Sequence, residues 1–203
     1  MPPIQAIYWL WDAWAVSWII AAVWRAPATA RPPVWTELWR DGVTLVGASL
    51  LIVWGSPFSG QGDRLDVRLH APLWRTPEGA GWALVAMTFA GFTFCWWARL
   101  HLGPLWSGVA GRTADHRVVD TGPYRLVRHP IYSGILAALL AMALEKGTAA
   151  VFIGLALAVA GFILKCRLEE GFLRAELGAE TYDAYRRRTP MLIPFSPRAS
   201  PPD

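Results

Sequence analysis

Two polar stretches of the sequence bring together side chains that can do chemistry. The first runs from Asp115 to Gly134 and holds two histidines, two tyrosines and three arginines; the second is Lys165-Cys166-Arg167-Leu168-Glu169-Glu170. Pro130 predicts that a helix begins directly after His129, because proline suits the first helical position. A helix N-terminus attracts anionic groups. The first stretch therefore predicts a site for a carboxylate or phosphate, with Arg128 among the donors.

The second stretch contributes the adjacent carboxylates of Glu169 and Glu170. Neighbouring residues in a helix point about 100° apart. We therefore expect at most one of the two to face the same site as the first stretch, and the other to be solvated.

Other kinds of site lack the residues they need. The sequence has no Gly-x-Gly-x-x-Gly, Walker or Gly-x-Ser-x-Gly motif. Its four histidines have no His-x-x-x-His or Cys-x-x-Cys partners, so no metal site is predicted. Cys95 and Cys166 lie in separate apolar segments and are expected to be inert thiols.

The composition indicates where these stretches must be positioned. Of 203 residues, 54% are hydrophobic and 17% are charged, whereas a soluble domain averages about a quarter charged residues. Thirteen tryptophans favour a membrane interface, where an indole ring is partly wet and partly apolar. We predict an all-α integral-membrane protein whose basic excess contacts anionic lipid, with no nucleic-acid partner.

Five segments approach the roughly 20 apolar residues of a membrane-crossing helix. They are residues 7–24, 42–58, 79–100, 131–144 and 148–164. The last two are short and are predicted to form a tight helical hairpin closed by Glu145-Lys146-Gly147. The C-terminal stretch, Tyr182 to Arg188 and then Met191 to Phe195, is amphipathic and is expected to supply a C-terminal helix and to lie on the membrane as a lid, with Arg186 to Arg188 at lipid phosphates.

The distribution of Lys and Arg predicts the orientation, since cytoplasmic loops collect these residues. With the N-terminus outside, fifteen basic residues between or after the spans are cytoplasmic and four are external. We therefore expect the C-terminus and the site to be cytoplasmic. Ala28-Thr29-Ala30 resembles a signal-peptidase site, but residues 1–8 carry no Lys or Arg, which favours a retained span. Asp12 in that span is expected to reach the outer interface.

The residues of the two stretches form an ordered set. Thr121-Gly122-Pro123-Tyr124-Arg125-Leu126-Val127-Arg128-His129-Pro130-Ile131-Tyr132-Ser133-Gly134 precedes the hairpin, and the Glu pair, Gly178, a Tyr-x-x-Tyr and an Ile-Pro-Phe follow it. Over residues 99–195 this set resembles the isoprenylcysteine carboxyl methyltransferase family, part of a wider group with phospholipid N-methyltransferases.

The resemblance implies a membrane methyltransferase that uses S-adenosylmethionine, with Glu169 holding the cofactor's amino group. The implied cofactor-binding residues are His116, Val118, Val119, Gly122, Tyr124, His129, Pro130, Tyr132 and Glu169. Residues 1–98 would then anchor the protein and 99–195 bind cofactor and catalyse, while 196–203 are expected to be a disordered tail.

One position departs from the resemblance and leaves the acceptor open. The prenylcysteine enzymes have an arginine four residues before the glutamate, where this sequence has Lys165, a point charge rather than a planar fork. Lys165 and Arg167 are the residues expected to orient an anionic acceptor, and with Glu169 they form the predicted catalytic set. Isoprenylcysteine carboxyl methylation is the first expectation. Phospholipid N-methylation, small-thiol S-methylation and, more distantly, a lipid reductase or a non-enzymatic lipid-binding scaffold are alternatives.

Overall fold

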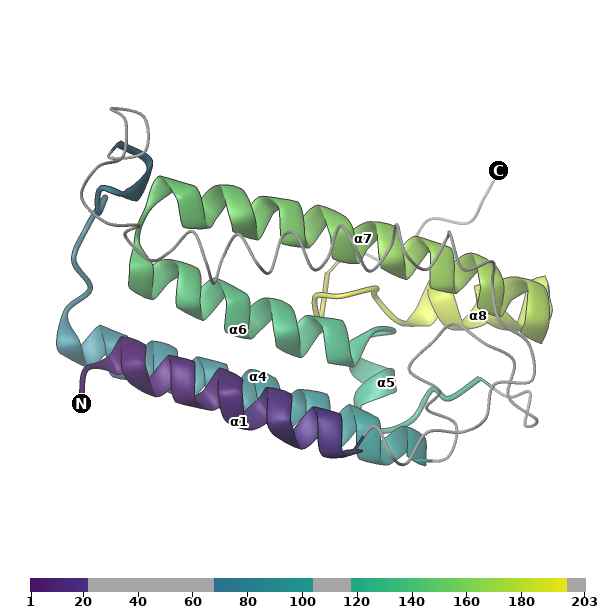
Figure 1. The fold of residues 1–203 in the computed structure, drawn as a ribbon. Helices are drawn as coiled ribbons and strands as arrows, with labels where there is room; N and C mark the ends of the chain where they lie inside the picture. Colours follow the sequence, from purple (N-terminus) through teal and green to yellow (C-terminus); the bar gives the residue numbers. More distant parts are fainter. Residues whose placement is uncertain (22–67, 104–117, 197–203) are drawn as a thin grey trace.

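The computed structural model describes residues 1–21, 68–103 and 118–196, and most of these residues are helical (Figure 1). In chain order the helices are α1 (Pro3–Ala21), α4 (Glu78–Leu102), α5 (Pro123–Leu126), α6 (Pro130–Lys146), α7 (Ala149–Leu177) and α8 (Ala179–Arg188). The predicted all-α fold is confirmed for these ranges. The span expected at 42–58 lies outside them, so the count of five spans stays a prediction.

Two helices in the described ranges, α4 and α7, are long and apolar enough to cross a membrane. α7 has 29 residues, about 44 Å of helix. The apolar span predicted at 148–164 forms the first part of this helix, which continues to Leu177 and is followed by Gly178 with a positive φ. Apolarity stops earlier, but the Leu, Glu and Arg residues that follow favour helix. The Glu pair therefore lies inside one continuous helix.

α4 and α6 approach each other backbone to backbone at two glycines. A Cβ built on Gly134 would lie 2.6 Å from Sγ of Cys95 and closer still to the carbonyl oxygen of Gly91. The Cys95 thiol also donates to the carbonyl of Ile131 at 3.2 Å. Small residues allow membrane helices to pack this closely. The beginning of α6 is thereby fixed against α4.

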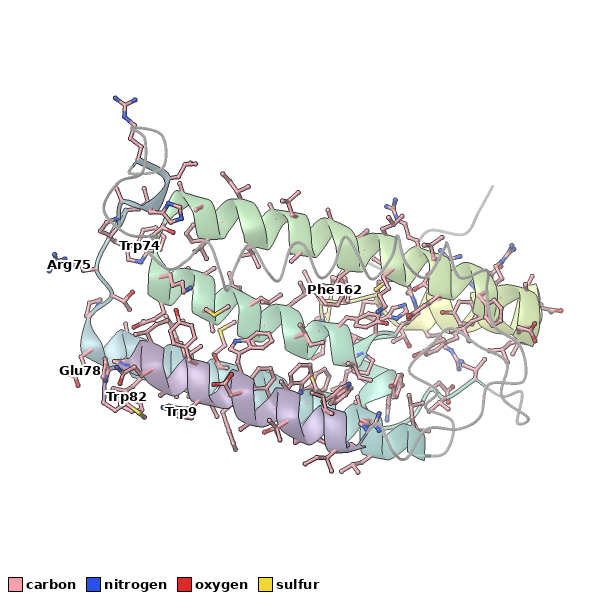
Figure 2. The ribbon with its side chains drawn as sticks, in the orientation of Figure 1. Trp9, Trp74, Arg75, Glu78, Trp82 and Phe162 are labelled. Atoms are coloured by element: carbon pink, nitrogen blue, oxygen red, sulfur yellow. The ribbon has the colours of Figure 1, made fainter. Side chains whose placement is uncertain are left out.

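The predicted hairpin turn between α6 and α7 is confirmed. Gly147 ends α6 in the left-handed conformation, with φ of 60°. The segment before α4 covers this turn: Leu73 donates its backbone N–H to the carbonyl of Gly147 at 2.7 Å, and Trp74 donates Nε1–H to that of Leu144 at 3.0 Å (Figure 2). Carbonyls that a helix end leaves unpaired are thus satisfied from another part of the chain.

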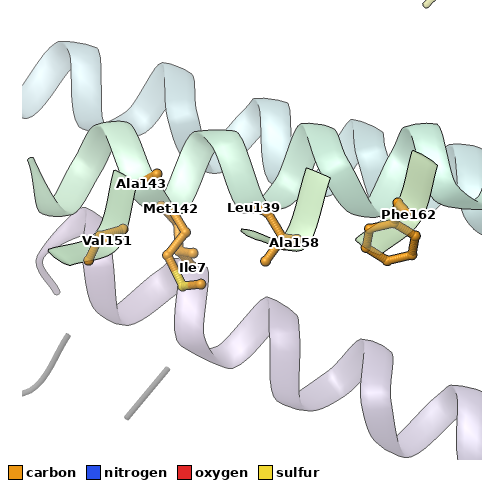
Figure 3. Packing of buried hydrophobic residues seen from close by; sticks show 7 residues of the cluster. All are labelled: Ile7, Leu139, Met142, Ala143, Val151, Ala158 and Phe162. Carbon is orange, nitrogen blue, oxygen red and sulfur yellow. The ribbon is translucent and has the colours of Figure 1, made fainter. Parts of the chain in front are cut away.

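The apolar core lies between α1, α6 and α7 (Figure 3). Its buried members are Ile7, Leu139, Met142, Ala143, Val151, Ala158 and Phe162. Phe162 lies at the end of the core nearer the Glu pair, where its ring contacts Tyr132 at a centroid distance of 5.2 Å. The core therefore continues directly into the polar end of the α6–α7 pair.

Aromatic side chains join α1 to α4, which lie side by side in Figure 1. Trp14 stacks on Phe92 with centroids 5.0 Å apart, and Trp18 meets Trp96 at 5.4 Å. Arg99 ends this row, with its guanidinium over the Trp18 ring and a hydrogen bond to the carbonyl of Ala21. Several of the tryptophans therefore serve helix packing.

Candidate functional site

His129 is held between the two carboxylates of the Glu pair. Its Nε2 lies 3.2 Å from Oε1 of Glu170, and its Nδ1 lies 3.6 Å from Oε2 of Glu169. The expectation that only one glutamate faces this site is therefore wrong. Although the two side chains diverge by about 100° on α7, an imidazole has a nitrogen on each side and fits between them.

Helix geometry explains how His129 reaches this position. It is the N-cap residue of α6, and Pro130 begins the helix as predicted. Both residues are buried. One turn further along α6, Tyr132 donates its hydroxyl to Oε1 of Glu169 at 2.5 Å and stacks on the imidazole with planes 9° apart. Three of the predicted cofactor-binding residues, His129, Tyr132 and Glu169, are therefore brought into contact.

The two predicted acceptor-orienting cations are placed differently. Lys165 lies one turn before Glu169 on α7, and its Nζ is 5.2 Å from the centre of the Tyr132 ring. Arg167 is exposed two residues further along, a separation of about 200° around the helix from Lys165. The structure brings Lys165, but not Arg167, to the face of α7 that carries Glu169 and contacts Tyr132 of α6.

Arg128, which was predicted to bind an anion, is instead buried and paired with a carboxylate of the protein. Nε of Arg128 lies 2.7 Å from Oε1 of Glu170, and the two side chains are 4% and 7% exposed. Arg128 also donates to the carbonyls of Arg186 and Thr189. It is therefore committed to protein partners. The sequence could not reveal this pairing, because an arginine near the start of a helix can bind either an anionic ligand or a glutamate that is distant in sequence.

Arg186 was expected at lipid phosphates, and the structure places it elsewhere. Its Nε lies 3.2 Å from Oε2 of Glu170, and its Nη1 lies 3.4 Å from Asp183. Glu170 thus contacts Arg128 and His129, which are neighbours at the start of α6, and Arg186 on α8. A buried carboxylate requires such partners. The position of Glu170 near a helical core was therefore the one sign in the sequence that nearby arginines would pair with it.

The chain after α8 docks on the start of α6 through its backbone. Arg128 and His129 donate their N–H groups to the carbonyls of Pro190 and Met191, at 2.9 and 3.1 Å. Ser133 donates its hydroxyl to the carbonyl of Leu192 at 2.6 Å. The C-terminal segment, residues 189–192, therefore packs against the site.

The remaining predicted cofactor-binding residues precede His129 in the sequence. Gly122 has φ of 56° and directly precedes the short α5 as its N-cap residue, and Tyr124 of α5 is buried. Burial raises the pKa of the Tyr124 phenol, and the neighbouring charges of Tyr185 and Glu169 add to the effect. Val118 and Val119 are half-buried in the segment leading to this turn. His116 lies outside the described residues.

Hydrogen bonding controls the charge of His129. Burial by itself would lower the pKa of its imidazole, but hydrogen bonds to Cys166, Glu169 and Glu170 raise that pKa well above the usual value. His129 lies just ahead of α6. The site thus combines an imidazolium with two carboxylates, of which Glu169 is the more exposed, at 18% against 7%.

Comparison with known proteins locates a match over most of this site. Residues 84–175 match the model of the isoprenylcysteine carboxyl methyltransferase (ICMT) family. Methanethiol S-methyltransferase 2 of Bradyrhizobium diazoefficiens is 33% identical over 137 residues, which cover 62% of this chain and 51% of that protein. The chain thus spans about half the length of this curated relative. The matched region contains His129, Tyr132 and the Glu pair, and over it the resemblance of this sequence to the isoprenylcysteine carboxyl methyltransferase family is confirmed.

Proposed function

We propose that this chain is an integral-membrane methyltransferase that uses S-adenosylmethionine and methylates a small apolar thiol. The observation that carries the proposal is the contact of His129 and Tyr132 with Glu169, inside the region that matches the family model. The two apolar helices α4 and α7 support a place in the membrane.

The residues present fit the cofactor's charged end. Glu169 accepts one short hydrogen bond from Tyr132, and its other oxygen lies 3.6 Å from Nδ1 of His129. It is also the more exposed member of the pair. Such a carboxylate retains capacity to accept hydrogen bonds from an ammonium group. Glu170, by contrast, already contacts three cationic side chains.

In the reaction, the protein holds the cofactor and the acceptor in place and excludes water. When bound, S-adenosylmethionine supplies a methyl group that is already activated for displacement. His129 and Tyr132 fix the direction of the Glu169 carboxylate. The rings of Tyr132 and Phe162 form an apolar wall that keeps water from the acceptor. Aligning the acceptor with the methyl group is then the main remaining requirement.

Two observations bear on the acceptor. The relative is named for methanethiol, and the matched family is named for isoprenylcysteine carboxyl groups. Lys165 beside Tyr132 offers one compact positive charge, which suits a thiolate better than it suits two-point binding of a carboxylate. Small-thiol S-methylation is therefore our first proposal, and carboxyl methylation of isoprenylcysteine is the second.

Calorimetry on the full chain in lipid nanodiscs tests the cofactor assignment. We expect S-adenosylmethionine to bind the wild type, and Glu169→Gln to weaken binding by about 10- to 100-fold, because a charged hydrogen bond contributes about 1.5–3 kcal/mol. Glu180→Gln, at an exposed position of α8, is the matched control and should bind like wild type. Equal affinity in Glu169→Gln and wild type would overturn the assignment of Glu169.

Methyl-labelled cofactor identifies the acceptor. The chain is incubated separately with a short alkyl thiol, S-farnesylcysteine and phosphatidylethanolamine vesicles. Label in the volatile thioether supports the first proposal, and label in the farnesylcysteine ester supports the second. Label in the phospholipid, or in none of the three, would contradict both.

A further inference from the structure

His101, in the last turn of α4, contacts the turn that leads into the candidate site. Its Nε2 lies 2.9 Å from Oγ1 of Thr121, within hydrogen-bond distance. Its ring stacks on Tyr124, with centroids 6.3 Å apart and planes inclined by 26°. One side chain of α4 thus makes a polar contact and a ring contact to residues three positions apart in the same turn.

The imidazole of His101 also rests directly on the backbone of Gly122. A Cβ built on Gly122 would lie 2.7 Å from Cε1 and 2.8 Å from Nδ1 of His101. Gly122 has φ of 56°, a conformation that disfavours residues with a Cβ. Glycine is therefore needed at this position both for the turn and for the approach of the histidine.

The opposite side of the turn is held by α8. Tyr185, which is buried, donates its hydroxyl to the carbonyl of Tyr124 at 2.8 Å. Tyr124 is thus fixed between His101 on α4 and Tyr185 on α8. Its phenol also lies within electrostatic reach of Glu169. The contacts of His101 are therefore connected to the candidate cofactor site through Tyr124.

We propose that His101 is a positioning residue that holds the Gly122–Tyr124 turn in the shape that binds the cofactor. This inference rests on the proposed function. His101 and Thr121 are both exposed, so their hydrogen bond adds little to global stability. Its effect is local, because it restrains a short turn whose left-handed glycine gives it conformational freedom. Substitution should therefore change cofactor affinity more than folding or maximal rate.

A double-mutant cycle on the full chain in nanodiscs tests this role. His101→Phe keeps a ring over Tyr124 but removes the nitrogen, and Thr121→Val removes the hydroxyl. We expect each to raise the Kd for S-adenosylmethionine about fivefold, the equivalent of one neutral hydrogen bond. The double variant should be no weaker than either single variant, because both remove the same bond. The rate at saturating cofactor should stay within about twofold of wild type.

Controls separate positioning from general damage. Leu100→Ala changes the exposed neighbour on α4 and should leave the Kd unchanged. His101→Gln, which restores a side-chain donor and acceptor, should recover part of the affinity. The buried thiols of Cys95 and Cys166 should stay unreactive toward maleimide in every variant, which verifies folding.

The outcomes distinguish this inference from the proposed function. If the wild type does not bind S-adenosylmethionine, the proposed function fails and this inference fails with it. If the wild type binds and the single variants bind equally well, only the role of His101 is refuted. Additive losses in the double variant would also refute it, because the two side chains would then act independently.

Discussion

Replacing Arg128 by methionine removes the cation at the centre of the buried charge network. Arg128 and Glu170 are 4% and 7% exposed and are joined at 2.7 Å. Breaking one partner of such a buried pair costs about 3–5 kcal/mol. Glu170 keeps contacts to His129 and Arg186, each at 3.2 Å, which offsets part of the loss. We therefore expect Arg128→Met to lower the free energy of unfolding by about 3 kcal/mol, at the low end of that range.

Arg174→Met is the matched control for this prediction. Arg174 also pairs with a carboxylate, that of Asp183 at 2.9 Å, but its side chain is 46% exposed. Solvent-exposed ion pairs contribute little to stability. Both variants replace an arginine that pairs with a carboxylate by methionine. The difference between their losses of unfolding free energy therefore measures the effect of burying the charge network.

The natural cysteines provide the assay. Cys95 and Cys166 are the two cysteines of the chain, and both are buried. Denaturant titration in detergent micelles, followed by maleimide labelling, gives the unfolding midpoint of each variant without an introduced probe. If Arg128→Met unfolded at the same denaturant concentration as Arg174→Met, the buried network would contribute no more than a surface pair, and the reasoning would be refuted.

Three further predictions concern the helix contact, the charge of the histidine and the tyrosine hydroxyl. Gly134→Ala should destabilise the fold by about 1–3 kcal/mol through overpacking against α4. Gly171 has open space around it, so Gly171→Ala should stabilise the fold by about 0.5–1 kcal/mol. Equal denaturation midpoints for the two variants would contradict this. Because the pKa of His129 is raised in the folded state, its contribution to stability is fully present below about pH 6.5 and is lost as the pH rises through the folded pKa. His129→Gln should therefore flatten that part of the plot of unfolding free energy against pH. An unchanged slope in this variant would count against the prediction. Tyr132→Phe should weaken cofactor binding about tenfold by removing the hydroxyl that orients Glu169, while the denaturation midpoint moves little; calorimetry showing wild-type affinity would refute this.

The local features of the site could be predicted from residue types with fixed backbone preferences. Pro130 indicated the beginning of α6, and Gly147 closed the predicted hairpin. Proline fixes its own φ at a helical value, and glycine allows the positive φ that ends a helix. Contacts such as those of His129 with Glu169, about 40 residues apart in sequence, have no local signal of this kind.

The partners of charged residues were predicted less well. Arg128 and Arg186 were assigned to ligands and lipids because each arginine alone is compatible with either. Their contacts with Glu170 depend on how α6, α7 and α8 come together. The partner of Glu170 was equally hard to predict. The expected 100° separation from Glu169 does not show that a side chain, His129, lies between the two carboxylates and contacts both. The ring geometry of His129, rather than helix periodicity, determined that both carboxylates are used.

The continuity of α7 makes its length part of the site. One helix runs from the hairpin turn through the apolar core to the Glu pair. Inserting a single residue between Ala149 and Phe162 would rotate everything beyond it by about 100° and advance it by about 1.5 Å. That rotation equals the angle between the two glutamates, so the side chain that now meets Tyr132 would move to a different face. The number of residues between turn and carboxylate is consequently as constrained as the identity of the carboxylate itself.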